Sequence, residues 1–188
     1  MIENWLISRR ALVFTGAALA TQRTSAGTPI IRFGLTPVFL SNDIELLDQL
    51  RDFLARHTGM SVVLVQRRTY EEITSLLLSS QLTAAWICGY PYVAYHDQLE
   101  LVATPLWQGQ PLYRSYLIGA AGRSASTINE LAGDTHAFSD PNSNSGYLVT
   151  QAALARLRRR PEEFFRRTFF TYGHRNVVRA VASGLAQS

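Results

Sequence analysis

Apolar and polar residues follow two different spacings along the chain beyond residue 29. The segments Ile30–Leu35 and Ser61–Val65 are short and almost continuously apolar, which favours buried strands. The stretch beginning at Ile44 instead repeats apolar residues every three or four positions and stops at Gly59, as an amphipathic helix does. The pattern therefore predicts a strand, a helix and a second strand in succession.

The same alternation continues in the next part of the chain. Thr69 and Glu72 have the spacing of a capping box before an apolar run that ends at Leu78. Thr83–Cys88 predicts a third strand, and Gly89–Tyr92 leads into a short helix. Strands that alternate with helices predict an α/β fold whose mostly parallel sheet is covered by helices. In such sheets ligands bind beyond the carboxyl ends of the strands.

The remaining segments predict a second unit of the same class. The pattern assigns a fourth strand at 99–103, a strand-like run at 112–120, a short capped helix at 127–131, strand-like stretches at 135–138 and 163–171, and helices at 147–157 and 176–185. We assign residues 27–111 to a first α/β lobe and residues 112–188 to a second, incomplete one.

Hydroxyl and amide side chains gather where the helix at 147–157 begins. Ser143, Asn144 and Ser145 precede its apolar spacing, at the end where a helix has unpaired N–H groups and a positive dipole. Such an end is suited to binding an anion, and Gly146 allows a ligand to approach the backbone closely. Ordinary helix capping is the alternative explanation of the same residues.

Composition describes a globular protein without a nucleic-acid partner. The 188 residues are 47% hydrophobic and 17% charged, with a formal net charge of +4, and every basic residue is Arg. A cluster of Arg at 156–167 is interrupted by Glu162 and Glu163 and matches no nucleic-acid motif. We interpret it as the solvated end of a helix.

The first 26 residues have the layout of an export signal. Paired Arg9 and Arg10 precede an apolar run at 11–20, and Thr24–Ala26 offers a small-residue cleavage site. The apolar run is too short to span a bilayer, and the paired Arg favour the twin-arginine route. We therefore expect a periplasmic protein without stable membrane insertion after signal removal. An amphipathic N-terminal helix of a cytoplasmic protein is the alternative.

Cysteine and histidine positions argue against a disulfide or a metal site. Cys88 is the single Cys, so no intrachain disulfide or thiol metal cluster can form, and we expect it to be a small buried hydrophobe in a strand. His57, His96 and His136 lie apart without ligand spacing. We expect neither a metal nor a cofactor.

Several landmark segments occur in a familiar order. They are Ile31–Pro37, Thr69–Tyr70, Gly89–Val93, Tyr113–Ile118, Asp140–Leu148 and Tyr172–Arg175. In this order they resemble the phosphate/phosphite/phosphonate-binding family of periplasmic solute-binding proteins, which serve ABC importers. The segment Asp-Pro-Asn-Ser-Asn-Ser-Gly-Tyr, followed later by His174, is the most specific part of the resemblance.

The resemblance implies a two-lobed fold that captures a small phosphorus oxyanion between its lobes and presents it to a membrane permease. The implied ligand-binding residues are Tyr70, Tyr92, Ser143, Asn144, Ser145, Gly146 and His174. Serine hydroxyls, the Asn144 amide and backbone N–H groups would hold the oxyanion, and His174 would donate from its imidazole. Tyr70 and Tyr92 would reach across from the first lobe as the lobes close.

The sequence departs from the family pattern in three places. Asn144 replaces a Thr, and Gly173 and Arg175 replace a Ser and an Asp beside His174. Arg175 would either favour a more anionic ligand or point to solvent. The chain also ends soon after the helix at 176–185, without the return crossing to the first lobe that the family's fold implies, so we expect a C-terminally truncated protein.

Two other functions compete with capture for import. Ser145, His174 and Asp140 have the residue types of a hydrolase triad, but the Gly-x-Ser-x-Gly pattern is absent and no catalytic residue is assigned. A ligand-sensing module that reports to a membrane kinase would use the same binding fold.

Overall fold

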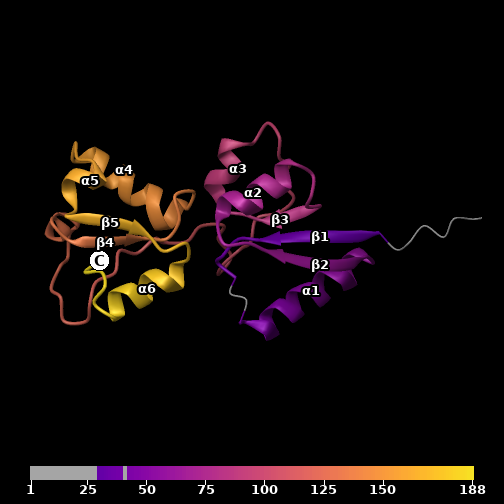
Figure 1. Cartoon of the computed structure of the whole chain (residues 1–188). Helices are drawn as coiled ribbons and strands as arrows, with labels where there is room; N and C mark the ends of the chain where they lie inside the picture. Colours follow the sequence, from indigo (N-terminus) through magenta and orange to yellow (C-terminus); the bar gives the residue numbers. More distant parts are fainter. Residues whose placement is uncertain (1–28, 40–41) are drawn as a thin grey trace, which may run out of the picture.

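The computed structural model describes residues 29–39 and 42–188, so the predicted export signal at 1–26 lies outside the described residues. Figure 1 shows the helices and strands in two groups, one around a sheet of three strands and the other around a sheet of two. Both sheets are parallel and carry helices. Within the described part of the chain, no helix is long and apolar enough to cross a membrane.

The first sheet has the strand order β2-β1-β3. The central strand β1 (Ile30–Leu35) pairs with β2 (Ser61–Gln66) along its whole length and with β3 (Ala84–Trp86) over its last residues. Leu35, at the end of the central strand, is completely buried. The strands predicted at 30–35, 61–65 and 83–88 are thus confirmed, the third in a shorter form.

Helices lie on both sides of this sheet. Figure 1 shows α1 (Ile44–Thr58) on one side and α2 (Tyr70–Leu78) with α3 (Gly89–Ala94) on the other. The first helix ends at Gly59, whose φ of 69° is the left-handed conformation that glycine adopts without strain. The second begins with the predicted capping box: Thr69 accepts from the Glu72 N–H, and Glu72 accepts from the Thr69 N–H.

Close packing holds α2 onto the sheet. Ile73, Val65 and Leu82 form a buried cluster between the helix and the strands. At Gly34 of β1 a Cβ atom would lie 2.5 Å from Leu82 Cδ1 and 3.2 Å from Ile73 Cγ2. The missing side chain of this glycine therefore lets α2 approach the strand, which fixes where the N-terminus of the helix points.

The second sheet pairs β4 (Thr135–Phe138) with β5 (Arg167–Phe170) in parallel. In Figure 1, α4 (Val149–Arg156) and α5 (Pro161–Phe164) lie on one side of it and α6 (His174–Ala182) on the other. A 3-10 turn at Ile128–Leu131 replaces the short α-helix predicted there.

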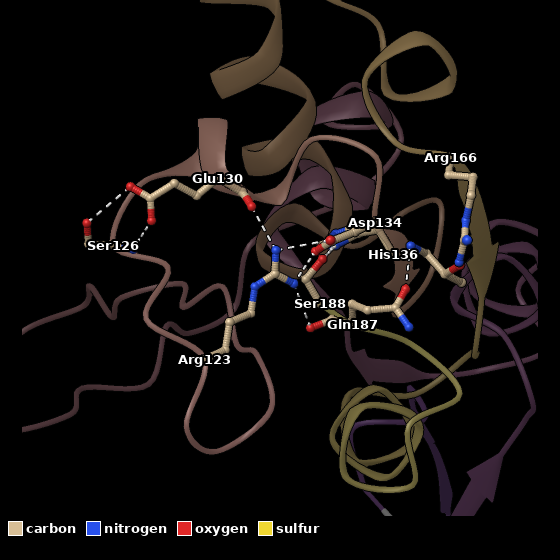
Figure 2. Close-up of polar contacts among 9 residues, drawn as sticks. Arg123, Ser126, Glu130, Asp134, His136, Arg166, Gln187 and Ser188 are labelled. Atoms are coloured by element: carbon tan, nitrogen blue, oxygen red, sulfur yellow. Dashed lines mark hydrogen bonds and ion pairs between the residues drawn. The ribbon is translucent and has the colours of Figure 1, made fainter.

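The core of this second group is aromatic and is bordered by a polar network. Phe138 and Phe165 are buried and both contact the ring of His136. Figure 2 shows Arg123 reaching Asp134, with Gln187 and Ser188 beside His136. The Gln187 N–H donates to the Thr135 carbonyl and the Ala137 N–H to that of Ser188, so these last residues line β4.

Some predicted elements are wrong. Residues 99–103 and 112–120 form no strand in the described structure, and most of their apolar side chains are exposed, with Val102 at 86% and Leu112 at 76%. An apolar run becomes a strand only where a neighbouring strand offers backbone partners, and neither run has one. Cys88 likewise lies beyond β3, partly exposed, at the start of α3.

Two helix starts also differ from prediction. The helix predicted from Tyr147 is preceded by a π-turn at Asn144–Leu148, and α4 begins only at Val149. The last helix begins at His174, earlier than the predicted Asn176, and ends at Ala182.

Candidate functional site

The segment between β4 and α4 is a tight turn organised by Asp140. The Asn142 N–H donates to Asp140 Oδ1 at 2.8 Å, and the Ser143 N–H donates to the Asp140 carbonyl at 3.0 Å. Asp140 and Ser143 are 1% and 0% exposed. A side chain that accepts from a backbone N–H two residues later is the usual way in which Asp stabilises a turn. This turn sets the direction in which the chain enters the π-turn.

Ser143 caps the π-turn with its hydroxyl. Its Oγ accepts from the Gly146 N–H at 3.0 Å, and its carbonyl accepts from the Leu148 N–H at 3.1 Å, the wider spacing that defines a π-turn. Such turns occur frequently at functional sites because they displace side chains and N–H groups from α-helical positions. Ser143 thus acts as a capping residue, which is one of the two explanations that the sequence left open.

Gly146 packs directly against Ser139. A Cβ atom at this glycine would overlap Ser139 Oγ and would lie 2.7 Å from Ser139 Cβ and 3.0 Å from His174 Cε1. The Ser139 N–H also donates to the Gly146 carbonyl at 3.2 Å. Ser139 Oγ is buried and has no hydrogen-bond partner within the described residues. An unpaired buried hydroxyl costs stability, so this group beside the π-turn calls for an explanation.

Tyr70 brings the first group of elements onto this loop. It is the first residue of α2, and its N–H donates to Asp140 Oδ2 at 3.1 Å. Its hydroxyl lies 3.2 Å from His174 Nε2, and the side chain is 1% exposed. Burial raises the pKa of the Tyr70 hydroxyl, and the neighbouring Cys88 and Asp140 act in the same direction. The group is therefore a neutral hydroxyl at any physiological pH.

His174 faces the same point from the start of α6. Its Nε2 lies 3.5 Å from Ser143 Oγ as well as 3.2 Å from the Tyr70 hydroxyl. Burial lowers the pKa of His174, while the field of Asp140 opposes that shift. We call Tyr70, Ser143 and His174 the hydroxyl–imidazole cluster. It joins three elements that are far apart in the sequence.

Ser145 and Asn144 lie at the edge of the cluster and have other partners. The Ser145 carbonyl accepts from Ser115 Oγ at 2.7 Å, and Tyr113 donates to Ser145 Oγ at 3.4 Å. Asn144 is exposed, and its backbone N–H donates to the Cys88 sulphur at 3.4 Å. Cys88 is therefore a hydrogen-bond acceptor facing the π-turn, a different role from the buried hydrophobe predicted.

The structure gathers most, but not all, of the residues predicted to bind ligand. Tyr70, Ser143, Gly146 and His174 are adjacent, whereas the Tyr92 hydroxyl forms no hydrogen bond with any other described residue. The Arg175 side chain is 51% exposed, in agreement with the solvent-facing alternative, and its guanidinium lies 3.5 Å from an Asp43 carboxylate oxygen. It forms no hydrogen bond or ion pair with the cluster in the described structure.

Sequence reasoning missed the residues that support the site. The sequence assigns Asp140 to a turn but does not reveal that its carboxylate accepts from the Tyr70 N–H of α2, nor that Ser139 packs against Gly146. The Asp-Pro pair after an apolar strand was a signal for the turn, since Asp in that position bonds nearby backbone N–H groups. Ser115 and Tyr113 belong to a run interpreted as a strand, so nothing in the sequence indicated their contact with Ser145.

The described residues do not support a metal site, or a ligand site in a surface hollow. They contain no group of three or more His, Cys, Asp or Glu side chains able to hold a metal ion. Two surface hollows, one against α2 and one beside α4, are open to solvent, and no residue of the hydroxyl–imidazole cluster lines either of them.

Comparisons with known proteins identify a family. A sequence profile described as the periplasmic substrate-binding protein of phosphonate ABC transporters matches residues 33–188. A binding component of an ABC phosphonate transporter from Pseudomonas aeruginosa is 23% identical with a TM-score of 0.72, and the match covers 85% of this chain and 56% of that one. PhnD1 from Prochlorococcus marinus in complex with methylphosphonate is 17% identical with a TM-score of 0.64, covering 84% and 61%.

The aliphatic sulphonate binding protein SsuA from Escherichia coli is also similar. It is 16% identical with a TM-score of 0.51, and the match covers 85% of this chain and 53% of SsuA. At these identities the structures show a shared fold. The chain spans little more than half the length of each of these proteins.

Proposed function

We propose that this chain, which belongs to the family of periplasmic substrate-binding proteins of phosphonate ABC transporters, binds a phosphorus oxyanion at the hydroxyl–imidazole cluster. The ligand class is phosphonate, phosphite or phosphate. The observation that carries the proposal is the convergence of Tyr70, Ser143 and His174 from three elements beside the π-turn. Hydroxyl and imidazole donors with nearby backbone N–H groups are the groups that bind tetrahedral oxyanions.

The roles of the individual residues follow from their positions. The Tyr70 hydroxyl and the His174 imidazole would turn from each other towards a ligand oxygen, each then acting as a donor. Ser145 and Asn144 would add a hydroxyl, an amide and their N–H groups at the edge. Gly146 keeps the loop close to Ser139, so that ligand oxygens can approach the backbone. For Tyr92 the support is the family resemblance alone.

We propose that the two groups of elements move relative to each other during capture. Tyr70 lies on α2 of the first group, and Ser143 and His174 belong to the second. A ligand that contacts residues of both groups would favour the conformation in which they are close. The membrane permease of an ABC importer, in a periplasmic setting, is the partner that would distinguish this conformation.

The geometry gives less support to a hydrolase. Ser143, not Ser145, is the serine within reach of His174. Both Asp140 carboxylate oxygens accept from backbone N–H groups, those of Tyr70 and Asn142, and neither is hydrogen-bonded to the His174 ring. A triad requires an acid that orients the imidazole, and this carboxylate instead organises the turn.

A thermal-shift panel tests the proposal. The 188-residue chain is melted alone and with methylphosphonate, phosphite, phosphate or sulfate. A ligand at about one hundred times its Kd adds about 2.7 kcal/mol, which raises Tm by about 5 to 10 °C in a protein of this size. We expect at least one phosphorus oxyanion to give such a shift. The proposal fails if none of them does while the chain still melts cooperatively.

Matched variants locate the ligand. Ser145→Ala and His174→Gln should reduce the shift, because each removes or alters a donor at the cluster. Ser124→Ala and His96→Gln, at exposed positions elsewhere, should leave it unchanged. Equal shifts in all four variants would place the ligand somewhere else.

A sensing module remains the second candidate because it uses the same fold and site. Its discriminating partner is a membrane kinase instead of a permease. Genes for a permease and an ATPase beside the coding sequence favour import, and a kinase gene there favours sensing.

A further inference from the structure

The candidate site contains little positive charge, and this limits the ligand it can hold. In the described part of the chain, no guanidinium forms a hydrogen bond or ion pair with Tyr70, Ser143, Ser145 or His174. The sequence has no Lys at all. Arg175, the cation next to His174, is held by Asp43 instead. A full negative charge in the site must therefore be balanced by dipoles and hydrogen bonds.

Asp140 further reduces the positive potential. Its buried carboxylate accepts a hydrogen bond from the Tyr70 N–H at the start of α2. The positive end of that helix is thus already matched by a negative charge. The remaining contributors are the N-terminus of α6, at His174, and the π-turn that leads into α4. Each helix N-terminus supplies about half an elementary charge, so together they balance about one negative charge.

The side chains that the structure places against His174 carry no positive charge. They are the Tyr70 hydroxyl from α2, and the Ser143 hydroxyl and the Asp140 carboxylate from the loop after β4. Burial also lowers the pKa of His174, which favours the neutral imidazole near neutral pH.

Building on the proposed function, we propose that the site selects its phosphorus oxyanion as the monoanion, with one acidic proton still on the ligand. The dianion would bring two charges to a site that balances about one. A protonated ligand oxygen also adds a donor, and the Tyr70 hydroxyl oxygen can accept it while its own proton is donated to another ligand oxygen. The site thus discriminates by ionisation state as well as by shape.

The test is the pH dependence of affinity for a ligand that ionises near neutral pH. A phosphate-type oxyacid loses its second proton at about pH 6 or somewhat above. Titration calorimetry with methylphosphonate should give a constant Kd below the ligand's second ionisation and a Kd that rises about tenfold per pH unit above it. Methanesulfonate, a permanent monoanion of similar shape, should show no such slope, and sulfate, a permanent dianion, should bind at no pH.

A variant separates a proton on the ligand from one on the protein. His174→Gln keeps a neutral hydrogen-bonding side chain, so it should weaken methylphosphonate binding but keep the same pH slope. A slope that disappears in this variant places the proton on the imidazole and overturns the inference. A methylphosphonate affinity that is level or rises above the second ionisation also overturns it, while leaving the proposed function intact. Failure of every oxyanion to bind at every pH overturns both.

Discussion

His136 and His174 are both largely buried and both belong to the second group of elements, yet their surroundings differ. The His136 ring stacks on Phe165 with centroids 4.2 Å apart and planes 4° apart, and its Nδ1 lies 2.8 Å from Ser188 Oγ. The Nε2 of His174 instead lies between two hydroxyls, those of Tyr70 and Ser143. Burial lowers the pKa of both imidazoles.

The comparison shows that burial alone does not distinguish a structural histidine from a functional one. What differs is which groups surround the ring nitrogens. His136 packs against aromatic rings, where a charged imidazole is poorly solvated, so protonation would destabilise the folded protein. His174 stands among groups that can exchange partners with an incoming ligand. The predictions below test this difference, beginning with the largest expected effect.

Removing the stacking partner of His136 should have the largest effect on stability. Phe165 is 3% exposed and packs on Phe138, Leu131 and Leu154 as well as on the histidine ring. Phe165→Ala should lower the free energy of unfolding by about 3 to 5 kcal/mol, measured by urea denaturation. Trp107→Ala, at a side chain that is 71% exposed, is the control and should change little. Equal effects of the two would mean that the aromatic core does not hold this group together.

Acid should destabilise the protein through His136. Burial lowers the pKa of His136 from 6.5 to about 4, although Asp134 acts in the opposite direction. The unfolded chain therefore takes up a proton below about pH 6.5 that the folded chain refuses until about pH 4. Stability should fall by about 3 kcal/mol across this window as pH decreases, followed by urea midpoints at successive pH values.

His136→Phe identifies the source of that acid sensitivity. The variant keeps an aromatic ring against Phe165 and removes the ionisable group, so stability should fall less between pH 6.5 and 4. The remaining loss is assigned to His174, whose pKa is shifted in the same direction. An unchanged pH profile in this variant would contradict the role assigned to His136.

Local pattern predicted the parts of the fold that depend on neighbours in sequence. The capping box at Thr69 and Glu72 and the helix stop at Gly59 both appear as expected, because each is satisfied within a few residues. The strand predictions for 99–103 and 112–120 were wrong because a strand depends on residues far away in the sequence. A strand needs a partner strand, and no spacing within these runs reveals whether one exists.

The candidate site was only partly predictable for the same reason. Ser143 and Gly146 were found because they lie at a helix start, and His174 and Tyr70 because a family resemblance placed them together. The contact of Asp140 with the Tyr70 N–H and the pairing of Arg175 with Asp43 join residues far apart in the sequence. Only the folded chain shows that Asp140 also bonds the start of α2 and that Arg175 lies beside Asp43.

Tyr70→Phe should have a moderate effect and one that differs between stability and binding. The ring remains buried, and only the hydroxyl that faces His174 Nε2 at 3.2 Å is lost. The free energy of unfolding should decrease by about 1 kcal/mol, the usual value for one hydrogen bond. The Kd for methylphosphonate should rise about tenfold, a further 1.4 kcal/mol, because the ligand loses a donor. Loss of stability with unchanged affinity would mean that the Tyr70 hydroxyl has a structural role only, like His136.

Arg175→Ala should have the smallest effect, although Arg175 is adjacent to His174 in sequence. Its ion pair with Asp43 spans 3.5 Å between partly exposed side chains, so the free energy of unfolding should change by less than about 1 kcal/mol. A double-mutant cycle with Asp43→Ala measures the coupling between the two charges. Because the guanidinium pairs with Asp43 and not with the hydroxyl–imidazole cluster, the Kd for methylphosphonate should stay within about twofold of the unmodified chain. A clear loss of affinity would mean that Arg175 leaves Asp43 and contacts the ligand. The site would then contain a cation, which contradicts the inferred preference for a monoanion.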